Sequence, residues 1–166
     1  MTLDELIARE CIRQTMARYN MAGDRLKGED FIAVFTDDAV LETERVPESD
    51  GFRCEGRDAI REWFGRWHSR DRGPSAQRAT FIRHHLSTSQ VEFNGPDTAR
   101  ARTYWVAYSD IGPDHCGYYV DVFRKAGEQW LIAHRKVRLD WRAPHSLYQT
   151  AIASLSDRQP TPDRQS

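Results

Sequence analysis

The sequence predicts an α+β domain, with helices in its first half and an antiparallel sheet in its second half. Apolar residues recur at helical spacing in the first half, and strand-like segments separated by turn residues follow from residue 80. The length of 166 residues fits one domain, and an aromatic content of 11% argues against disorder. We expect residues 1–143 to form the domain and residues 144–166 to be a partly disordered C-terminal extension.

Residues 3–22 are predicted to form the first helix, because apolar side chains recur every three or four positions in one stripe that includes Tyr19. Thr2 is a suitable N-cap, and Glu5 completes a capping box. Gly23 is expected to end the helix in a left-handed conformation.

Two further helices and one short strand are expected before the sheet. A short helix is predicted over residues 28–35, a strand over residues 39–43, and a loop over residues 44–52, which include proline, serine and glycine. The third helix begins at Gly56 and places large apolar residues on one face.

The second half of the chain is rich in β-branched and aromatic residues, which favour strands. Clusters of Gly, Pro, Asn and Asp separate these segments and predict the turns of an antiparallel meander. The predicted strands are residues 80–93, 98–109, 116–124 and 129–141, and the predicted turns are residues 94–97, 112–114 and 125–128.

Charge and composition argue against several classes of protein. The chain has 24 Lys and Arg against 25 Asp and Glu, a balance that does not favour nucleic-acid binding. No run approaches the roughly 18 apolar residues of a membrane span, and the acidic N-terminal residues do not resemble a signal peptide. Cys11, Cys54 and Cys116 are scattered and odd in number, which does not favour a disulfide framework. The sequence indicates a cytoplasmic protein that binds neither nucleic acid nor membrane.

One charged residue lies on the apolar face of the last predicted strand. Alternation assigns Arg135 to the same face as Val137. A buried guanidinium needs a carboxylate partner or a cavity. Asp121 is the obvious internal carboxylate, because it shares a face with Tyr119 and Phe123. The pattern therefore leaves two interpretations open, a structural ion pair and a charged group at a functional cavity.

The consecutive residues His84 and His85 point to opposite faces of a strand, so they cannot bind one metal ion together. A zinc site needs three or four converging ligands, and the cysteines and histidines show no such spacing. No GxGxxG, GxxxxGK[ST] or GxSxG motif occurs. We therefore expect no metal and no cofactor. One of the two histidines faces inward, in a structural or a catalytic role.

Tyr19 and Asp24 lie near the end of the first helix. A chain reversal at Gly23 would bring the Asp24 carboxylate back toward the cavity that Tyr19 faces. In the alternative interpretation, Tyr19 is a core aromatic residue and Asp24 bonds only the local backbone.

Seven short segments occur in an order and spacing that we compare with known families: residues 19–24, 35–40, 56–60, 85–89, 99–104, 117–119 and 130–135. Together they resemble the SnoaL-like group of the nuclear transport factor 2-like superfamily, which includes dehydratases and a dehydrochlorinase. This resemblance implies a cone-shaped, curved antiparallel sheet wrapped around three N-terminal helices, with an internal apolar pocket.

The resemblance also implies a catalytic set of Tyr19, Asp24, His85 and Arg135. In the lyases of the group, the Asp pairs with the His, and the Tyr and the Arg point into the pocket. His85 is chosen over His84 because Leu-Ser-Thr-Ser follows it in the family register. Some dehydratases add a second His or an Asp on the next strand, for which residues 108–110 offer no clear equivalent.

These inferences predict a cofactor-independent lyase that performs a dehydratase-type elimination on a small hydrophobic cyclic or polycyclic molecule. The protein is expected to be a homo-oligomer, with a trimer favoured over a dimer. Alternatives are a non-catalytic β-type subunit of a ring-hydroxylating dioxygenase, a small-ligand-binding module, and a ketosteroid-type isomerase. The residues expected in the pocket wall are Phe35, Trp105, Tyr119 and Asp121.

Overall fold

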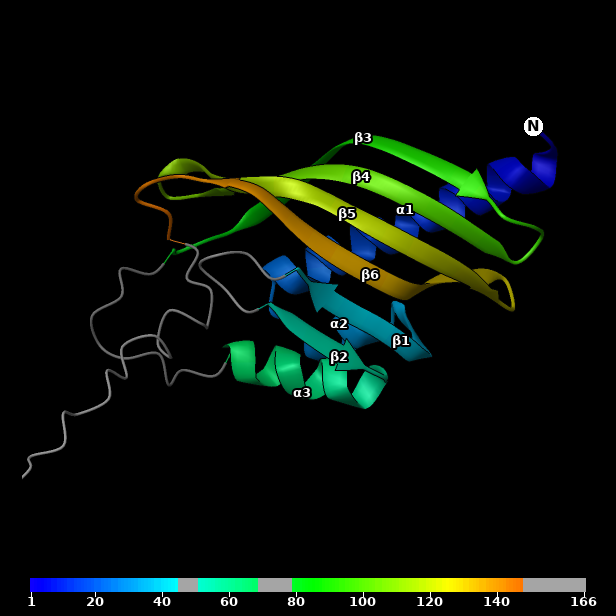
Figure 1. Ribbon diagram of the computed structural model, residues 1–166, viewed down its shortest axis with the longest axis horizontal. Helices are drawn as coiled ribbons and strands as arrows, with labels where there is room; N and C mark the ends of the chain where they lie inside the picture. The colour runs from blue at the N-terminus through cyan, green and yellow to red at the C-terminus, as the bar shows by residue number, and fades with distance from the viewer. Residues whose placement is uncertain (45–50, 69–78, 148–166) are drawn as a thin grey trace, which may run out of the picture.

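The computed structural model describes residues 1–44, 51–68 and 79–147, and its α+β architecture agrees with the sequence prediction (Figure 1). The helices are α1 (Leu3–Asp24), α2 (Gly28–Ile32) and α3 (Arg57–His68). The strands are β1 (Phe35–Thr43), β2 (Phe52–Glu55), β3 (Arg83–Phe93), β4 (Thr98–Ser109), β5 (Gly112–Ala126) and β6 (Gln129–Arg142).

The strands form one sheet in the order β2-β1-β6-β5-β4-β3. Strands β3 to β6 are an antiparallel meander of long curved strands, with α1 behind them and β1, β2 and α3 along the lower edge in Figure 1. Strand β1, however, pairs in parallel with β6, so that Leu41 lies opposite Arg135. The prediction of a wholly antiparallel sheet is wrong at this pair. A parallel pair needs a long crossover connection, which the whole chain from β2 to β5 provides here.

Helix α1 begins and packs as its sequence predicts. The Glu5 amide donates to Thr2 Oγ1 at 3.2 Å, and the Thr2 amide donates to Glu5 Oε2 at 2.9 Å, which is the predicted capping box. Farther along, Ile12, Met16 and Tyr19 are buried on one face of the helix. This stripe forms the core together with the inner face of the sheet.

The end of α1 differs from the prediction. The helix continues through Gly23 to Asp24, and the left-handed residue is Leu26, at φ 58°. A Cβ atom at Gly23 would lie 3.7 Å from the Phe31 ring, an ordinary contact distance, so the packing of α2 against α1 does not require a glycine there. The chain therefore reverses after Asp24, and this residue stays on the helix.

Three element boundaries also differ from the prediction, each because backbone pairing makes strand of residues that were not predicted as strand. The second helix ends at Ile32 rather than at residue 35, and β1 begins at Phe35 rather than at residue 39, since Phe35 pairs with Ile132 of β6. Residues 52–55 form β2, which pairs with the end of β1. Residues 112–114, the predicted turn, belong to β5, where Gly112 pairs with Ser109 at a positive φ of 89°.

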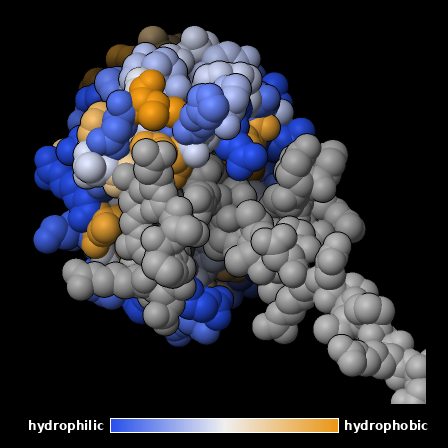
Figure 2. All heavy atoms as spheres, turned by 90° about the vertical axis from the view of Figure 1, so that its left-hand side faces the viewer, coloured by the Kyte–Doolittle hydropathy of each residue, from blue (hydrophilic) through white to orange (hydrophobic). Residues whose placement is uncertain are grey.

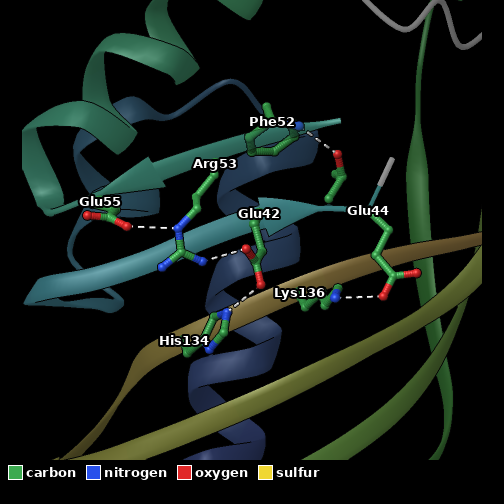
Figure 3. Close-up of polar contacts among 8 residues, drawn as sticks. Glu42, Glu44, Phe52, Arg53, Glu55, His134 and Lys136 are labelled. Carbon is green, nitrogen blue, oxygen red and sulfur yellow. Dashed lines mark hydrogen bonds and ion pairs between the residues drawn. The ribbon is translucent and has the colours of Figure 1, made fainter. Parts of the chain in front are cut away.

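A network of charged side chains joins β2, β1 and β6 (Figure 3). Glu42 accepts a hydrogen bond from Arg53 Nη1 at 2.6 Å, and His134 Nε2 lies 2.9 Å from its other oxygen. Nearby, Lys136 pairs with Glu44 at 2.6 Å. These groups are partly exposed, so each pair contributes at most about 1 kcal/mol to stability. The network adds side-chain contacts to the backbone pairing at the parallel junction.

Beyond β6, only residues 144–147 of the predicted C-terminal extension are described, and residues 148–166 lie outside the described residues. The end of the molecule on the left of Figure 1 shows apolar side chains in small groups among hydrophilic ones, on the part of its surface that is not grey (Figure 2). Among the described helices, none has the length and apolar character needed to cross a membrane.

Candidate active site

A cavity of about 110 Å³ lies at the C-terminal end of α1, between this helix and the inner face of the sheet. A mostly apolar cavity with a few polar groups is the usual form of a small-molecule site. Its apolar wall includes Leu26, Phe31, Phe52, Trp63, Ile82, Trp105 and Val137. Its polar residues are Tyr19, Asn20, Asp24, Thr43, His84, His115 and Tyr119.

His84 and Asp24 form a hydrogen-bonded pair at this cavity. His84 Nδ1 lies 2.6 Å from Asp24 Oδ1, and the His84 amide donates to Asp24 Oδ2 at 2.9 Å. The Asp24 side chain is only 7% exposed, and that of His84 is 19% exposed. Because a carboxylate can only accept, the Nδ1 atom carries the proton and Nε2 holds the free lone pair. The pair therefore presents an oriented imidazole base to the cavity.

The structure corrects the assignment of His85. His85 is exposed and lies on the outer face, where its ring packs edge-on against Tyr108 with centroids 5.0 Å apart. His84 is paired with Ala107, which is fully buried on the inner face of β4. Residues directly opposite each other in a sheet share a face. Of the two histidines, His84 is therefore the inward one.

The physical reason for the error is an irregularity in β3. The pairing with β4 shifts register between Leu86 and Ser89. Counting back by twos from the inward residues Val91 and Phe93 reaches His85, but the shift reverses the alternation. No local residue pattern revealed this shift, so the register of the following residues chose the wrong histidine.

A second Asp–His pair, absent from the predicted site, lies beside the first. His115 Nδ1 is 2.8 Å from Asp114 Oδ1, and the two side chains are 2% and 1% exposed. The rings of His115 and His84 lie 6.0 Å apart at an angle of 85°. Two oriented imidazoles from β3 and β5 thus reach the same cavity. Within the described ranges, no three His, Cys, Asp or Glu side chains converge as metal ligands would.

Burial and hydrogen bonding lower the pKa values of both members of this second pair. Burial lowers the pKa of His115 to about 4, although Asp114 opposes this effect. Burial alone would raise the pKa of Asp114, but the hydrogen bonds it accepts from Ser146, Leu147 and Ser109 outweigh burial and lower the pKa to about 2. At neutral pH, Asp114 is ionised and His115 is a neutral imidazole.

The sequence did contain a signal for His115. Tyr119, Asp121 and Phe123 are buried on one face of β5, and the same alternation extended backward reaches His115. The prediction missed it because residues 112–114 were expected to form a turn and the strand was expected to begin at Cys116.

Arg135 lies behind the cavity wall and forms an ion pair there. It donates to both carboxylate oxygens of Asp121, at 2.8 and 2.7 Å, and is fully buried. Its guanidinium carbon lies 4.1 Å from the centre of the Tyr19 ring and 4.0 Å from that of Tyr119. This geometry confirms the inward Arg135 and its partner Asp121. The expectation that Arg135 points into the pocket is wrong, because Tyr19 and Tyr119 line the cavity and Arg135 does not.

Of the four residues predicted to line the pocket wall, two line the cavity and two do not. Trp105 and Tyr119 line the cavity, with their rings stacked 5.7 Å apart. Asp121 and Phe35 do not line it: Asp121 is engaged by Arg135, and Phe35 packs edge-on against Tyr19 in the core. A further wall residue, Asn20, accepts a hydrogen bond from the Tyr119 hydroxyl at 3.0 Å.

The fold and this site define a domain of the SnoaL-like family. The family profile, described as a SnoaL-like domain, matches residues 4–136, and the chain therefore belongs to this family. Its fold is that of the nuclear transport factor 2-like proteins. A search of curated proteins finds no match to the sequence.

Solved structures of three kinds share this fold. A candidate scytalone dehydratase from Novosphingobium aromaticivorans is 24% identical, with a TM-score of 0.69 over 92% of this chain and 95% of its own. A hexachlorocyclohexane dehydrochlorinase from Novosphingobium barchaimii is 15% identical, with a TM-score of 0.67 over 86% and 92%. The β subunit of a candidate aromatic-ring-hydroxylating dioxygenase from N. aromaticivorans is 18% identical, with a TM-score of 0.66 over 84% and 93%. At these identities the similarity shows the fold alone.

Proposed function

We propose that this protein is a cofactor-independent lyase that eliminates water from a small, hydrophobic, cyclic carbonyl compound. The observation that carries the proposal is the His84–Asp24 hydrogen bond of 2.6 Å at the wall of an apolar cavity. A general base needs an oriented lone pair, and the carboxylate supplies the orientation by fixing the proton on Nδ1. Asp24 also stabilises the imidazolium that forms when Nε2 takes a proton.

In the proposed reaction, His84 Nε2 removes a proton from the carbon beside the carbonyl group. The carbon–hydrogen bond breaks, and its electrons form the enolate. The enolate then collapses to a carbon–carbon double bond as the bond to the neighbouring hydroxyl breaks. The imidazolium returns its proton to that hydroxyl, which leaves as water. Positioned acid–base groups of this kind supply about 10²–10⁴ in rate.

Two further polar residues of the cavity, Tyr19 and His115, are proposed to lie near the carbonyl and hydroxyl oxygens of such a substrate. Burial raises the pKa of Tyr19, so its hydroxyl stays protonated and can donate to the developing oxyanion. His115 stays neutral, because burial lowers its pKa to about 4. As a neutral imidazole, it adds a polar group to the cavity wall beside His84. Different environments thus assign different roles to the two histidines.

The cavity favours a compact substrate. Its volume of about 110 Å³ is of the order of an apolar cavity that binds benzene, about 150 Å³. Trp105 and Tyr119, stacked in the wall, offer flat surfaces to a ring. A water-poor wall also strengthens the electrostatic effect of the few polar groups.

The test uses a cyclohexanone that carries a β-hydroxyl group, whose dehydration yields cyclohexenone, which is followed by its ultraviolet absorbance. We expect the protein to accelerate cyclohexenone formation and the Asp24→Asn variant to lose this activity. Equal activity in both proteins would refute the proposed pair.

A second candidate function is a non-catalytic β-type subunit of a dioxygenase, favoured by the similarity to such a subunit. That function requires a partner chain and leaves the two imidazoles without a catalytic task. Turnover by the purified chain alone supports the lyase, whereas solubility only with a partner chain supports the subunit. A ketosteroid-type isomerase is a weaker fit, because its base is usually a carboxylate.

The cytoplasmic location and the homo-oligomer, with a trimer favoured over a dimer, are also proposals. Tyr104 and Val120 are exposed on the outer face of the sheet and would be covered in such an oligomer. Light scattering on the purified protein measures the oligomeric state.

A further inference from the structure

The indole of Trp105 carries a buried hydrogen-bond donor at the cavity wall. Trp105 is 5% exposed and lines the cavity. Within the part of the chain that the structure describes, its Nε1 atom has no hydrogen-bond acceptor. Buried polar groups of folded proteins are nearly always paired, because an unpaired one loses the hydrogen bonds that water would give it. This N–H group therefore indicates a partner that is bound from outside the chain.

The ring of Trp105 lies among other residues of the cavity wall. Tyr119 stacks on it, with the ring centroids 5.7 Å apart at an angle of 25°. The rings of His84 and His115 pack against it at angles of 60° and 75°, with centroids 5.7 and 5.5 Å away. All three neighbours line the same cavity. A molecule bound in the cavity would therefore contact the indole.

Two wall residues carry oxygens that could accept from Trp105, but these oxygens already accept other hydrogen bonds. Asp24 accepts from both the ring and the amide of His84, at 2.6 and 2.9 Å. Asn20 Oδ1 accepts from the Tyr119 hydroxyl at 3.0 Å. The remaining source of an acceptor for Trp105 Nε1 is a molecule in the cavity.

A purely apolar wall has no use for this donor. Trp and Phe both present a flat ring to a ligand, but only Trp carries an N–H group, whose burial without a partner costs free energy. An acceptor on the ligand recovers that cost, whereas a hydrocarbon of the same shape does not. Sites with a buried polar group discriminate strongly against analogues that leave it unpaired.

We propose that Trp105 Nε1 donates a hydrogen bond to an oxygen atom of the ligand and so selects cyclic ketones over hydrocarbon rings of the same shape. This inference deepens the proposed function and rests on it for the choice of a cyclic ketone. Trp105 determines specificity in this account, and proton transfer stays with His84.

The experiment measures the binding of two probes to the full chain, cyclohexanone and methylenecyclohexane. The two molecules have nearly the same shape, but only the ketone has an acceptor, and neither carries the hydroxyl group that dehydration removes. NMR titrations give the dissociation constants for the unmodified protein, Trp105→Phe and Trp130→Phe. Trp130→Phe is the matched control, because Trp130 is 4% exposed and does not line the cavity.

We expect the ratio of the two dissociation constants, hydrocarbon over ketone, to fall about three- to tenfold in Trp105→Phe and to stay unchanged in Trp130→Phe. In the unmodified protein, the ketone should also move the indole N–H proton signal of Trp105 to lower field, and methylenecyclohexane should not. This second measurement needs no variant, so it decides the point even where Trp105→Phe folds poorly.

An unchanged ratio in Trp105→Phe, or an equal fall in Trp130→Phe, would overturn the inference. So would a Trp105 signal that the ketone leaves in place, or an unmodified protein that does not bind the ketone. Both measurements concern binding alone. Selection of the ketone by Trp105, without dehydration of the β-hydroxy ketone, would count against the proposed lyase and not against the role of Trp105.

Discussion

Asp24 and His84 are 60 residues apart in the chain, yet their side chains meet at 2.6 Å. Asp24 is the last residue of α1, and His84 is the second residue of β3. Asp24 bonds both the ring and the backbone amide of His84, so the ring and the start of the strand are fixed together. Such support from rigid elements is what a positioned base requires.

The ion pair between Arg135 and Asp121 is predicted to control stability. Arg135→Met leaves a fully buried carboxylate without its partner, and we expect a loss of about 3–5 kcal/mol in the free energy of unfolding. Combining Arg135→Met with Asp121→Leu removes the unpaired charge and should restore most of this loss. Denaturant unfolding measures both variants. A double variant as unstable as the single one would contradict the account.

Acid is predicted to destabilise the fold through His115. Its pKa is lowered from 6.5 to about 4 in the folded state, so the unfolded chain binds the proton first as the pH falls. The contribution of His115 to the free energy of unfolding is complete above pH 6.5. It falls by roughly 3 kcal/mol as the pH is lowered toward 4. The lowered pKa of Asp114 also makes acid destabilising, but over a lower pH range, from its ordinary pKa of 3.8 down to about 2.

Unfolding free energies measured at pH 7, 5.5 and 4.5 test this dependence. In His115→Gln, the amide can still donate to Asp114, but it does not titrate. We expect the variant to lose much less stability than the unmodified protein over this range. Parallel curves for the two proteins would show that His115 is not the responsible group.

Gly117 is predicted to tolerate no side chain. A Cβ atom there would lie 1.9 Å from the Arg138 carbonyl oxygen, so the backbone of β6 would have to move. We expect Gly117→Ala to cost about 1–3 kcal/mol or more. Gly65→Ala is the matched control, because a Cβ atom at this helical position meets nothing within 4 Å and should stabilise by about 0.5–1 kcal/mol. Thermal unfolding compares the two variants. Similar melting temperatures would contradict the claim that the β6 backbone leaves no room for a side chain at position 117.

Patterns local in the sequence predicted much of this molecule. The capping box of Thr2 and Glu5 formed as expected because its partners are three residues apart. Arg135 was predicted to be internal because strand alternation is a local rule, and Asp121 followed from the same rule on the neighbouring strand. The family resemblance also drew attention to Asp24, which does meet an inward histidine.

Features that depend on distant pairing were not predictable in this way. The parallel neighbour of β1 is the last strand of the sheet, and no residue of β1 encodes that choice locally. The register shift between Leu86 and Ser89 arises from the fit of β3 to β4, and it exchanged the roles of His84 and His85. His115 was missed because residues 112–114 were predicted to form a turn, whereas pairing with β4 and β6 extends β5 back through these residues.

The neighbouring histidines provide the most direct test of the central claim, that His84 is the base of a lyase. His84→Gln and His85→Gln make the same chemical change one residue apart, on opposite faces of β3. The measurement is the rate of cyclohexenone formation from the β-hydroxycyclohexanone, with circular dichroism confirming the fold of both variants. We predict that the rate falls by a factor of about 10²–10⁴ in His84→Gln. In His85→Gln, the rate should stay within about twofold of that of the unmodified protein. Full activity in His84→Gln, or an equal loss in both variants, would contradict the claim.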